Sequence, residues 1–137
     1  MEQPEYGNAD ATYQAAGGQA GIRRLVDSFF DIMSSDPRYR SIYDMHPPDK
    51  EMSRDKLALF LCGWMGGPWP FIDKYGPISI PNAHKHLKIT EVERDLWLDC
   101  MARALSLQEY PSSLVEYLRQ QFYFPAERVR SVCMGQQ

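Results

Sequence analysis

The segment ITEVERDLWLDCMARAL, residues 89–105, carries the clearest helical pattern of this 137-residue chain. Thr90 and Glu93 have the spacing of a capping box, in which each side chain accepts a hydrogen bond from the other residue's backbone N–H. We therefore expect a helix to begin at Thr90. Its apolar face should comprise the residues that recur at helical spacing, which are Val92, Leu96, Trp97, Cys100, Met101, Ala104 and Leu105.

Three other segments show the helical period and complete a set of four principal helices. The first should begin near Gly21, and the second should begin near Asp49 and end before the Gly-Gly-Pro sequence at 66–68. The last should begin near Ser113, where the sequence SLVE provides a second capping box. Pro125 should kink or end this helix, with about one more turn beyond it.

No segment alternates convincingly between apolar and polar residues, so the expected fold class is all-α. Residues 68–82 contain four prolines and one glycine, which predicts a long irregular connection. The aromatic residues within it indicate that this connection is ordered. Residues 1–12 should form a flexible N-terminal tail, and residues 13–137 should form a single domain.

The composition is that of an ordinary globular protein, with 44% hydrophobic and 24% charged residues. A net charge of −3 argues against nucleic acid as a partner. No stretch approaches the roughly 18 apolar residues of a membrane span, and the N-terminus lacks the order of a secretory signal. The odd number of widely spaced cysteines, Cys62, Cys100 and Cys133, indicates reduced thiols. We therefore expect a cytoplasmic protein without a membrane partner.

Two of the three histidines, His84 and His86, lie in the stretch NAHKHLKIT at 82–90. On a helix, side chains two residues apart point about 200° apart, so at most one of them faces a given ligand. On a strand they would share a face. Zinc needs three or four protein ligands, whereas haem iron needs only one. Two interpretations remain open: both histidines lie on the surface, or one binds a haem in a pocket lined by the many Met and aromatic side chains.

Three stretches carry a resemblance to a known family: GGQAGIRRLVDSFFDIM at 17–33, LALFLCGWMGGP at 57–68 and AHKHLKITEVERDLWLDCM at 83–101. In this order and spacing they resemble the truncated haemoglobins of group II. The resemblance covers roughly residues 13–132, and the third stretch is its most specific part. It implies a truncated globin-like two-over-two helical sandwich around haem b, in which residues 68–82 replace most of one globin helix.

The resemblance also implies roles for single residues. His84 lies five residues before Ile89, which is the position of the family's proximal iron ligand, and His86 is left as a surface residue. Trp97 matches a tryptophan that lies over the distal side of the haem, where its N–H can donate to a bound ligand. The alternative for Trp97 is an ordinary core residue.

The second helix of this pattern supplies further haem contacts by the same resemblance. Leu57 and Phe60 match apolar positions that face the haem, and Lys56 matches a basic position that pairs with a haem propionate. The alternative for Lys56 is a solvent-exposed lysine, because such pairs contribute little free energy.

The distal side departs from the family pattern. Where the family has a tyrosine that donates to bound oxygen, this chain has Phe30, which has no hydroxyl. Tyr43 matches a second family tyrosine and can replace that donor, in a loop about two residues longer than usual. His46 lies three residues further on and can occupy the same place. If His46 reaches the iron, the ferric haem is six-coordinate with His84 and His46; the alternative is a solvent-exposed loop histidine.

The expected function is that of a haem b protein that reversibly binds O2, CO or NO, with oxygen binding or transport as the family's formal role. Distal donors slow the escape of O2, so the alternatives are detoxification of NO or reactive oxygen species, peroxidase-like turnover, or gas sensing. Turnover would need a separate reductase, because the chain lacks a dinucleotide motif such as G-x-G-x-x-G. A haem-free helical adaptor is the remaining alternative, against which His84 and Trp97 argue.

Overall fold

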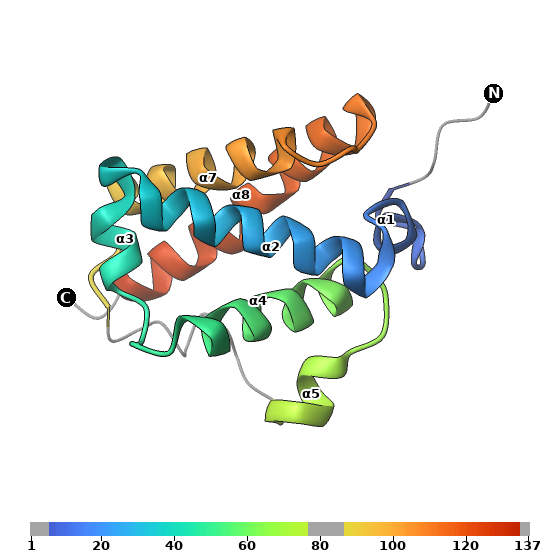
Figure 1. The fold of residues 1–137 in the computed structure, drawn as a ribbon, viewed down its shortest axis with the longest axis horizontal. Coiled ribbons are helices and arrows are strands. Elements are labelled where there is room, and N and C mark those ends of the chain that lie inside the picture. Colours follow the sequence, from blue (N-terminus) through green and yellow to red (C-terminus); the bar gives the residue numbers. More distant parts are fainter. Residues whose placement is uncertain (1–5, 77–86, 135–137) are drawn as a thin grey trace.

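The computed structural model describes residues 6–76 and 87–134, which form helices and their connections (Figure 1). In chain order the elements are α1 (Ala11–Ala15), α2 (Gly18–Ser35), the short 3-10 helix η1 (Pro37–Tyr39), α3 (Arg40–Asp44), α4 (Lys50–Trp64), α5 (Pro70–Tyr75), α7 (Glu91–Ser106) and α8 (Ser112–Met134). These described residues contain no strand, and the predicted all-α class is confirmed. Within the same ranges, no helix has the length and apolar character needed to span a membrane.

Two helices begin where the sequence predicts. Asp49 precedes α4, and its Oδ1 accepts a hydrogen bond from the Met52 N–H at 3.0 Å. Thr90 precedes α7, and its N–H donates to Glu93 Oε1 at 2.8 Å, within a complete capping box. At the start of a helix the first backbone N–H groups have no partner within the helix. The side chains of Asp49 and Glu93 accept hydrogen bonds from backbone N–H groups at these two starts and so stabilise them. The predicted starts at Asp49 and Thr90 are confirmed.

One residue of the predicted apolar face of α7 is not buried. Val92 is 62% exposed, so its assignment to that face is wrong. The fully buried residues of α7 lie in its second half, from Cys100 to Leu105, whereas Leu96 and Trp97 are half-buried. The apolar residues of α7 therefore begin nearer the start of the helix than the part of α7 that is buried in the core.

α8 starts near Ser113, as predicted, but without the predicted cap. The helix begins at Ser112, so Ser113 is already helical and the predicted capping box at Ser113 is wrong. The Ser113 hydroxyl instead lies 2.8 Å from the hydroxyl of Tyr6. The Tyr6 ring also packs against Tyr117, with ring centroids 5.2 Å apart. These contacts hold Tyr6, near the start of the described chain, against α8.

The proline in α8 does not end the helix. Pro125 lies inside α8, which continues to Met134, so the expected end about one turn later is wrong. The segment after the proline is held by ion pairs. Glu127 contacts Arg130 one turn further along, and its Oε1 lies 3.0 Å from the guanidinium of Arg94 on α7. Packing against α7 therefore stabilises a helical turn that the proline alone would disfavour.

Part of the predicted irregular connection at 68–82 is helical. α5 spans Pro70–Tyr75, and its proline lies in the first turn, where no backbone N–H is required. Trp69, directly before it, packs on Gly63 of α4 so closely that an added Cβ would lie 2.0 Å from the indole. The expectation of an irregular chain is wrong for α5, and residues 77–82 lie outside the described part of the chain.

The four long helices form two packed pairs. α2 packs against α4 on one side and against α7 on the other, and α8 packs along α7 (Figure 1). α2 therefore lies at the centre of the fold. It supplies a large share of the fully buried side chains, namely Ile22, Leu25, Val26, Phe29, Phe30 and Met33.

Candidate functional site

The two histidines of the NAHKHLKIT stretch, His84 and His86, lie outside the described residues. The argument that only one of them binds a ligand therefore stays a prediction. The other predicted site residues lie on four helices and one turn: Phe30 on α2, Tyr43 on α3, His46 in the turn after α3, Lys56, Leu57 and Phe60 on α4, and Trp97 on α7.

A row of aromatic rings connects several of these elements. Its members, which we call the aromatic row, are in order His46, Phe30, Phe29, Trp97, Phe122 and Trp64, with successive ring centroids 4.7–5.7 Å apart. The three phenylalanines are fully buried, whereas the histidine and both tryptophans are half-buried. The row brings together three of the predicted site residues, Phe30, His46 and Trp97, from separate parts of the sequence.

A stripe of half-buried apolar side chains runs along α4. Leu57, Phe60 and Trp64 lie at helical spacing and stay partly exposed, while Ala58 and Cys62 on the neighbouring face are buried. Within the described ranges, α4 packs extensively on α2 and α5 but not on α7 or α8. Large apolar side chains left partly exposed in this way fit a planar apolar group such as a haem, which would cover them.

Two of the predicted site residues, Trp97 and Tyr43, are half-buried and carry groups that can donate hydrogen bonds. Neither the Trp97 indole N–H nor the Tyr43 hydroxyl has a hydrogen-bond partner among the residues that the structure describes. Phe30 is 1% exposed and contributes only an apolar ring. Partly buried donors of this kind gain free energy when a ligand or a water molecule accepts their hydrogen.

His46 lies in the turn that follows α3 and is half-buried. Its Nδ1 is 2.9 Å from the carbonyl oxygen of Ile42, so Nδ1 carries the hydrogen and donates it. In the neutral imidazole the lone pair then resides on Nε2. Histidines that ligate metals commonly donate their other N–H to a backbone carbonyl in this manner. The hydrogen bond of His46 therefore has the form that suits a metal ligand.

Lys56 lies at the exposed edge of α4, with its Nζ 5.2 Å from the Tyr75 ring centroid. Asp55 Oδ2 accepts hydrogen bonds from Lys74 Nζ at 2.8 Å and from the Tyr75 hydroxyl at 2.6 Å. The hydrogen bond from Lys74 has the larger effect and that from Tyr75 the smaller, and both hold the pKa of Asp55 below its usual value. The carboxylate of Asp55 is thus bound by Lys74 and Tyr75. Among the described residues, Lys56 forms no ion pair. Lys56 can therefore pair with a carboxylate of a ligand.

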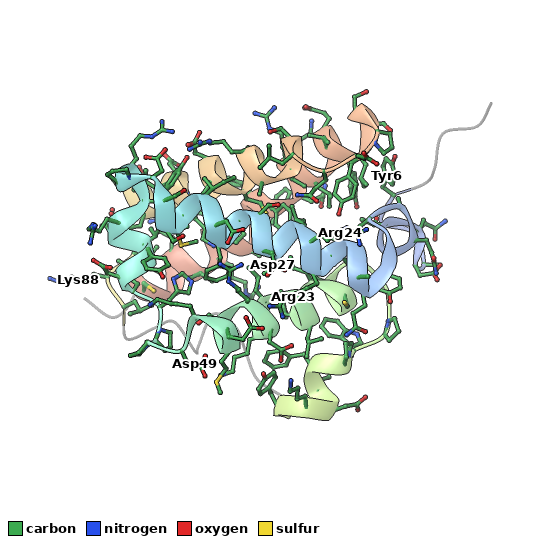
Figure 2. All side chains as sticks on the ribbon, viewed as in Figure 1. Tyr6, Arg23, Arg24, Asp27, Asp49 and Lys88 are labelled. Atoms are coloured by element: carbon green, nitrogen blue, oxygen red, sulfur yellow. The ribbon has the colours of Figure 1, made fainter. Side chains whose placement is uncertain are left out.

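Arg54 of α4 was not among the predicted site residues. Its guanidinium forms ion pairs with Asp27 at 3.1 Å and Asp31 at 2.7 Å, and lies 5.6 Å from the Phe30 ring centroid. Figure 2 shows Arg23 and Asp27 on the side of α2 that faces α4. The four-residue spacing of the two aspartates places both on one face of α2, and this spacing is the sequence signal of the network. The network fixes α4 beside the buried ring of Phe30.

Comparison with known proteins identifies the fold's relatives. The family model described as bacterial-like globin matches residues 11–131. The curated protein Group 2 truncated hemoglobin YjbI from Bacillus subtilis (strain 168) is 28% identical over 109 residues, which cover 80% of this chain and 80% of the relative.

Two solved structures share the arrangement of helices. The cold-adapted truncated hemoglobin from the Antarctic marine bacterium Pseudoalteromonas haloplanktis TAC125 has a TM-score of 0.81 and 35% identity, over 86% of this chain and 95% of that chain. The group II 2-on-2 hemoglobin from the plant pathogen Agrobacterium tumefaciens has a TM-score of 0.80 and 29% identity, over 87% of this chain and 92% of that chain. The predicted truncated globin-like two-over-two sandwich is confirmed.

Proposed function

The chain belongs to the bacterial-like globin family, as a truncated haemoglobin of group II, and from that premise we propose that it binds haem b and reversibly binds O2, CO or NO. Haem and a diatomic ligand follow from the family. We assign the proximal iron ligand to His84, because it has the family's spacing before Ile89. When bound, haem would supply an iron atom that can coordinate a diatomic ligand.

One observation above all supports this proposal: two distal donors lack a protein partner among the described residues. The Trp97 indole N–H and the Tyr43 hydroxyl would donate to a ligand that carries partial negative charge. Phe30 and Phe29, whose rings are fully buried, border this region with apolar surface. A hydrogen bond in such a low-dielectric environment is stronger than in water.

The faces of α4 would hold the planar group. Leu57 and Phe60 present half-buried apolar surface to it, and covering this surface contributes about 25 cal/mol for each Å² of apolar area removed from water. Lys56 at the exposed edge of α4 would pair with a propionate. A pair so exposed contributes less than about 1 kcal/mol and serves mainly to orient the group.

We further propose that His46 ligates the iron in the ferric form through Nε2, together with His84. Two observations support this assignment: the Nδ1–H is already donated to Ile42, and the imidazole packs against Phe30. Binding of O2, CO or NO would then require His46 to leave. His46 would thus compete with external ligands for one position.

The test of haem binding is an absorption spectrum of the purified protein, ferric and then reduced, and after addition of hemin. We expect a Soret band in the wild type. His84→Ala should weaken or shift it, and His86→Ala, the matched control two residues away, should leave it unchanged. If His86→Ala has the larger effect, the proximal assignment is wrong, and absence of any Soret band with added hemin contradicts haem binding altogether.

The sixth ligand is tested in the ferric protein. The wild type should have low-spin absorption bands, which His46→Ala should replace by high-spin bands. Tyr43→Phe is the control, because it removes the other side chain that can reach the same place. An unchanged ferric spectrum of His46→Ala would exclude His46 as a ligand.

Redox turnover is the second candidate, favoured by the two distal donors Trp97 and Tyr43. Strong donors slow the escape of O2, and slow escape suits detoxification of NO or a sensor better than bulk transport. Detoxification would need electrons from a separate reductase. Oxidation of NO to nitrate by the O2 complex, measured by stopped-flow absorption, distinguishes this candidate from simple reversible binding.

A further inference from the structure

Lys50 is the first residue of α4 and is half-buried. The N-terminus of a helix carries a partial positive charge, so a cation is disfavoured there. Other contacts must therefore account for the position of this side chain. They come from residues 43–48, which we call the distal turn and which comprise the end of α3 and the residues that lead from it to Asp49, labelled at the start of α4 in Figure 2.

The ammonium group of Lys50 lies among three carbonyl groups of the distal turn. It donates to the carbonyl oxygens of His46 at 2.8 Å and Pro47 at 2.9 Å, and that of Tyr43 is 3.5 Å away. It also lies 4.6 Å from the centroid of the Tyr43 ring, a distance that permits a cation–π interaction. These acceptors match the three hydrogens of an ammonium group. The contacts offset the unfavourable position at the helix start.

The distal turn needs such a donor because of its prolines. Pro47 and Pro48 have no backbone N–H, so neither can donate a hydrogen bond that would close the turn. The His46 N–H donates to the Tyr43 carbonyl at 3.1 Å. The Lys50 side chain therefore supplies donors that the two prolines cannot, at the residue that carries the imidazole.

We propose that Lys50 is a positioning residue that holds His46 in the conformation from which its Nε2 ligates the iron. This inference rests on the proposed function, and specifically on ligation by His46. With the ammonium in place, the His46 carbonyl is fixed by Lys50 and the imidazole is fixed by Ile42 and Phe30. Without it, the turn has more conformations, and the fraction with the imidazole in place falls.

The experiment compares the ferric wild type with two substitutions of Lys50. Lys50→Met keeps much of the aliphatic volume but removes every donor, and should lower the ratio of low-spin to high-spin haem about tenfold. Lys50→Arg keeps the charge and donors in a different geometry, and should stay within about threefold of the wild type. Glu51→Gln is the control, because Glu51 pairs with Arg23 and lies in the same helical turn without a contact to the distal turn among the described residues.

A second readout does not depend on iron ligation. In the reduced CO complex, where CO occupies the sixth position, nitrogen NMR of the His46 ring reports which nitrogen carries the hydrogen. The wild type should have the hydrogen on Nδ1, because we expect the imidazole to move off the iron while the distal turn keeps its bond to Ile42. Lys50→Met should show a mixture of both forms, and Lys50→Arg should restore the wild-type form.

The outcomes separate this inference from the proposed function. Haem binding with an unchanged spin ratio and ring form in Lys50→Met overturns the role of Lys50 alone. A high-spin wild type that matches His46→Ala overturns His46 ligation and this inference with it, while haem binding stands. Absence of a Soret band overturns the proposed function first. If Lys50→Met does not fold, Lys50→Gln takes its place, because it retains a neutral donor. We expect Lys50→Gln to have a ratio of low-spin to high-spin haem between those of the wild type and His46→Ala. A ratio equal to that of the wild type would contradict the inference.

Discussion

The ring of Phe30 stands edge-on to the imidazole of His46, with centroids 5.1 Å apart and ring planes at 74°. One residue lies in the buried centre of α2 and the other in the distal turn after α3. Because Phe30 carries no polar atom, the hydrogen-bonding groups of this region come from elsewhere in the chain, namely His46, Tyr43 and Trp97.

Phe30→Tyr should slow O2 release. The substitution adds a hydroxyl beside His46, and one additional hydrogen bond of about 1.4 kcal/mol corresponds to about a tenfold slower dissociation. Stopped-flow displacement of O2 by CO measures this rate. Phe29→Tyr is the matched control, because both rings are fully buried and either added hydroxyl should destabilise the fold, whereas only the ring of Phe30 contacts His46. Equal O2 dissociation rates in Phe30→Tyr and wild type would contradict the distal placement.

Trp97→Phe should accelerate O2 release, again by about tenfold, because it removes the indole N–H. The smaller ring can keep contacts with Phe29 and Phe122, so the free energy of unfolding should fall by less than about 1.5 kcal/mol. O2 dissociation and urea denaturation measure the two effects. Tyr123→Phe, at a ring on α8 that is 41% exposed and packs on Phe124, should leave the rate near that of the wild type. A normal rate in Trp97→Phe would make Trp97 a core residue only.

Gly63→Ala should destabilise the contact between α4 and the start of α5. The added Cβ would lie 2.0 Å from the Trp69 ring, and such overpacking costs about 1–3 kcal/mol. Urea denaturation of Gly63→Ala, Trp69→Ala and the double variant measures the coupling. With the indole removed, the alanine should be tolerated, so the double variant should be more stable than the sum of the two single effects predicts. Strict additivity would mean that the two residues do not interact.

Glu127 should stabilise the protein in a pH-dependent way. Hydrogen bonds from Arg130, and then from Arg94, lower the pKa of Glu127 from 4.5 to about 2. Because the folded-state pKa is the lower one, the stabilisation is fully present above pH 4.5 and is lost as the pH falls toward about 2. The difference in unfolding free energy between wild type and Glu127→Gln should therefore shrink across this window. Urea denaturation at several pH values measures it.

A matched control for the acid titration is Glu116→Gln. The Glu116 side chain is 63% exposed and lies 4.0 Å from Arg119 on the same helix. Exposed pairs of this kind contribute little, so the substitution should change stability slightly and equally across the window. A difference for Glu127→Gln that stays constant from pH 5 to pH 2 would contradict the lowered pKa.

Local signals were sufficient for part of the fold. The start of α7 depends on Thr90 and Glu93, which are three residues apart, so a short stretch of sequence contains the whole interaction. The course of α8 beyond Pro125 could not be predicted in this way. It depends on the ion pair between Glu127 and Arg94, residues separated by 33 positions and brought together only by the packing of α8 on α7.

The residues of the candidate site likewise differ in whether they could be predicted from the sequence. Phe30, His46 and Trp97 were identified from the sequence by a family resemblance, and the aromatic row brings them together. Their roles toward a haem stay predictions, as does that of His84. Lys50 could not be found from the sequence, because its acceptors are backbone carbonyl groups, which every residue has.

The tryptophans of the aromatic row also give the protein an intrinsic fluorescence signal close to the candidate site. Trp64 and Trp97 both contact Phe122 and are half-buried, whereas Trp69 is 46% exposed and its ring lies 6.1 Å from that of Phe60, between centroids. Haem absorbs light at the wavelengths where tryptophan emits, so energy transfer to a haem beside Phe60 would quench the emission of all three indoles. The intrinsic fluorescence of the protein would thus report the filling of the space beside α4 without any added label.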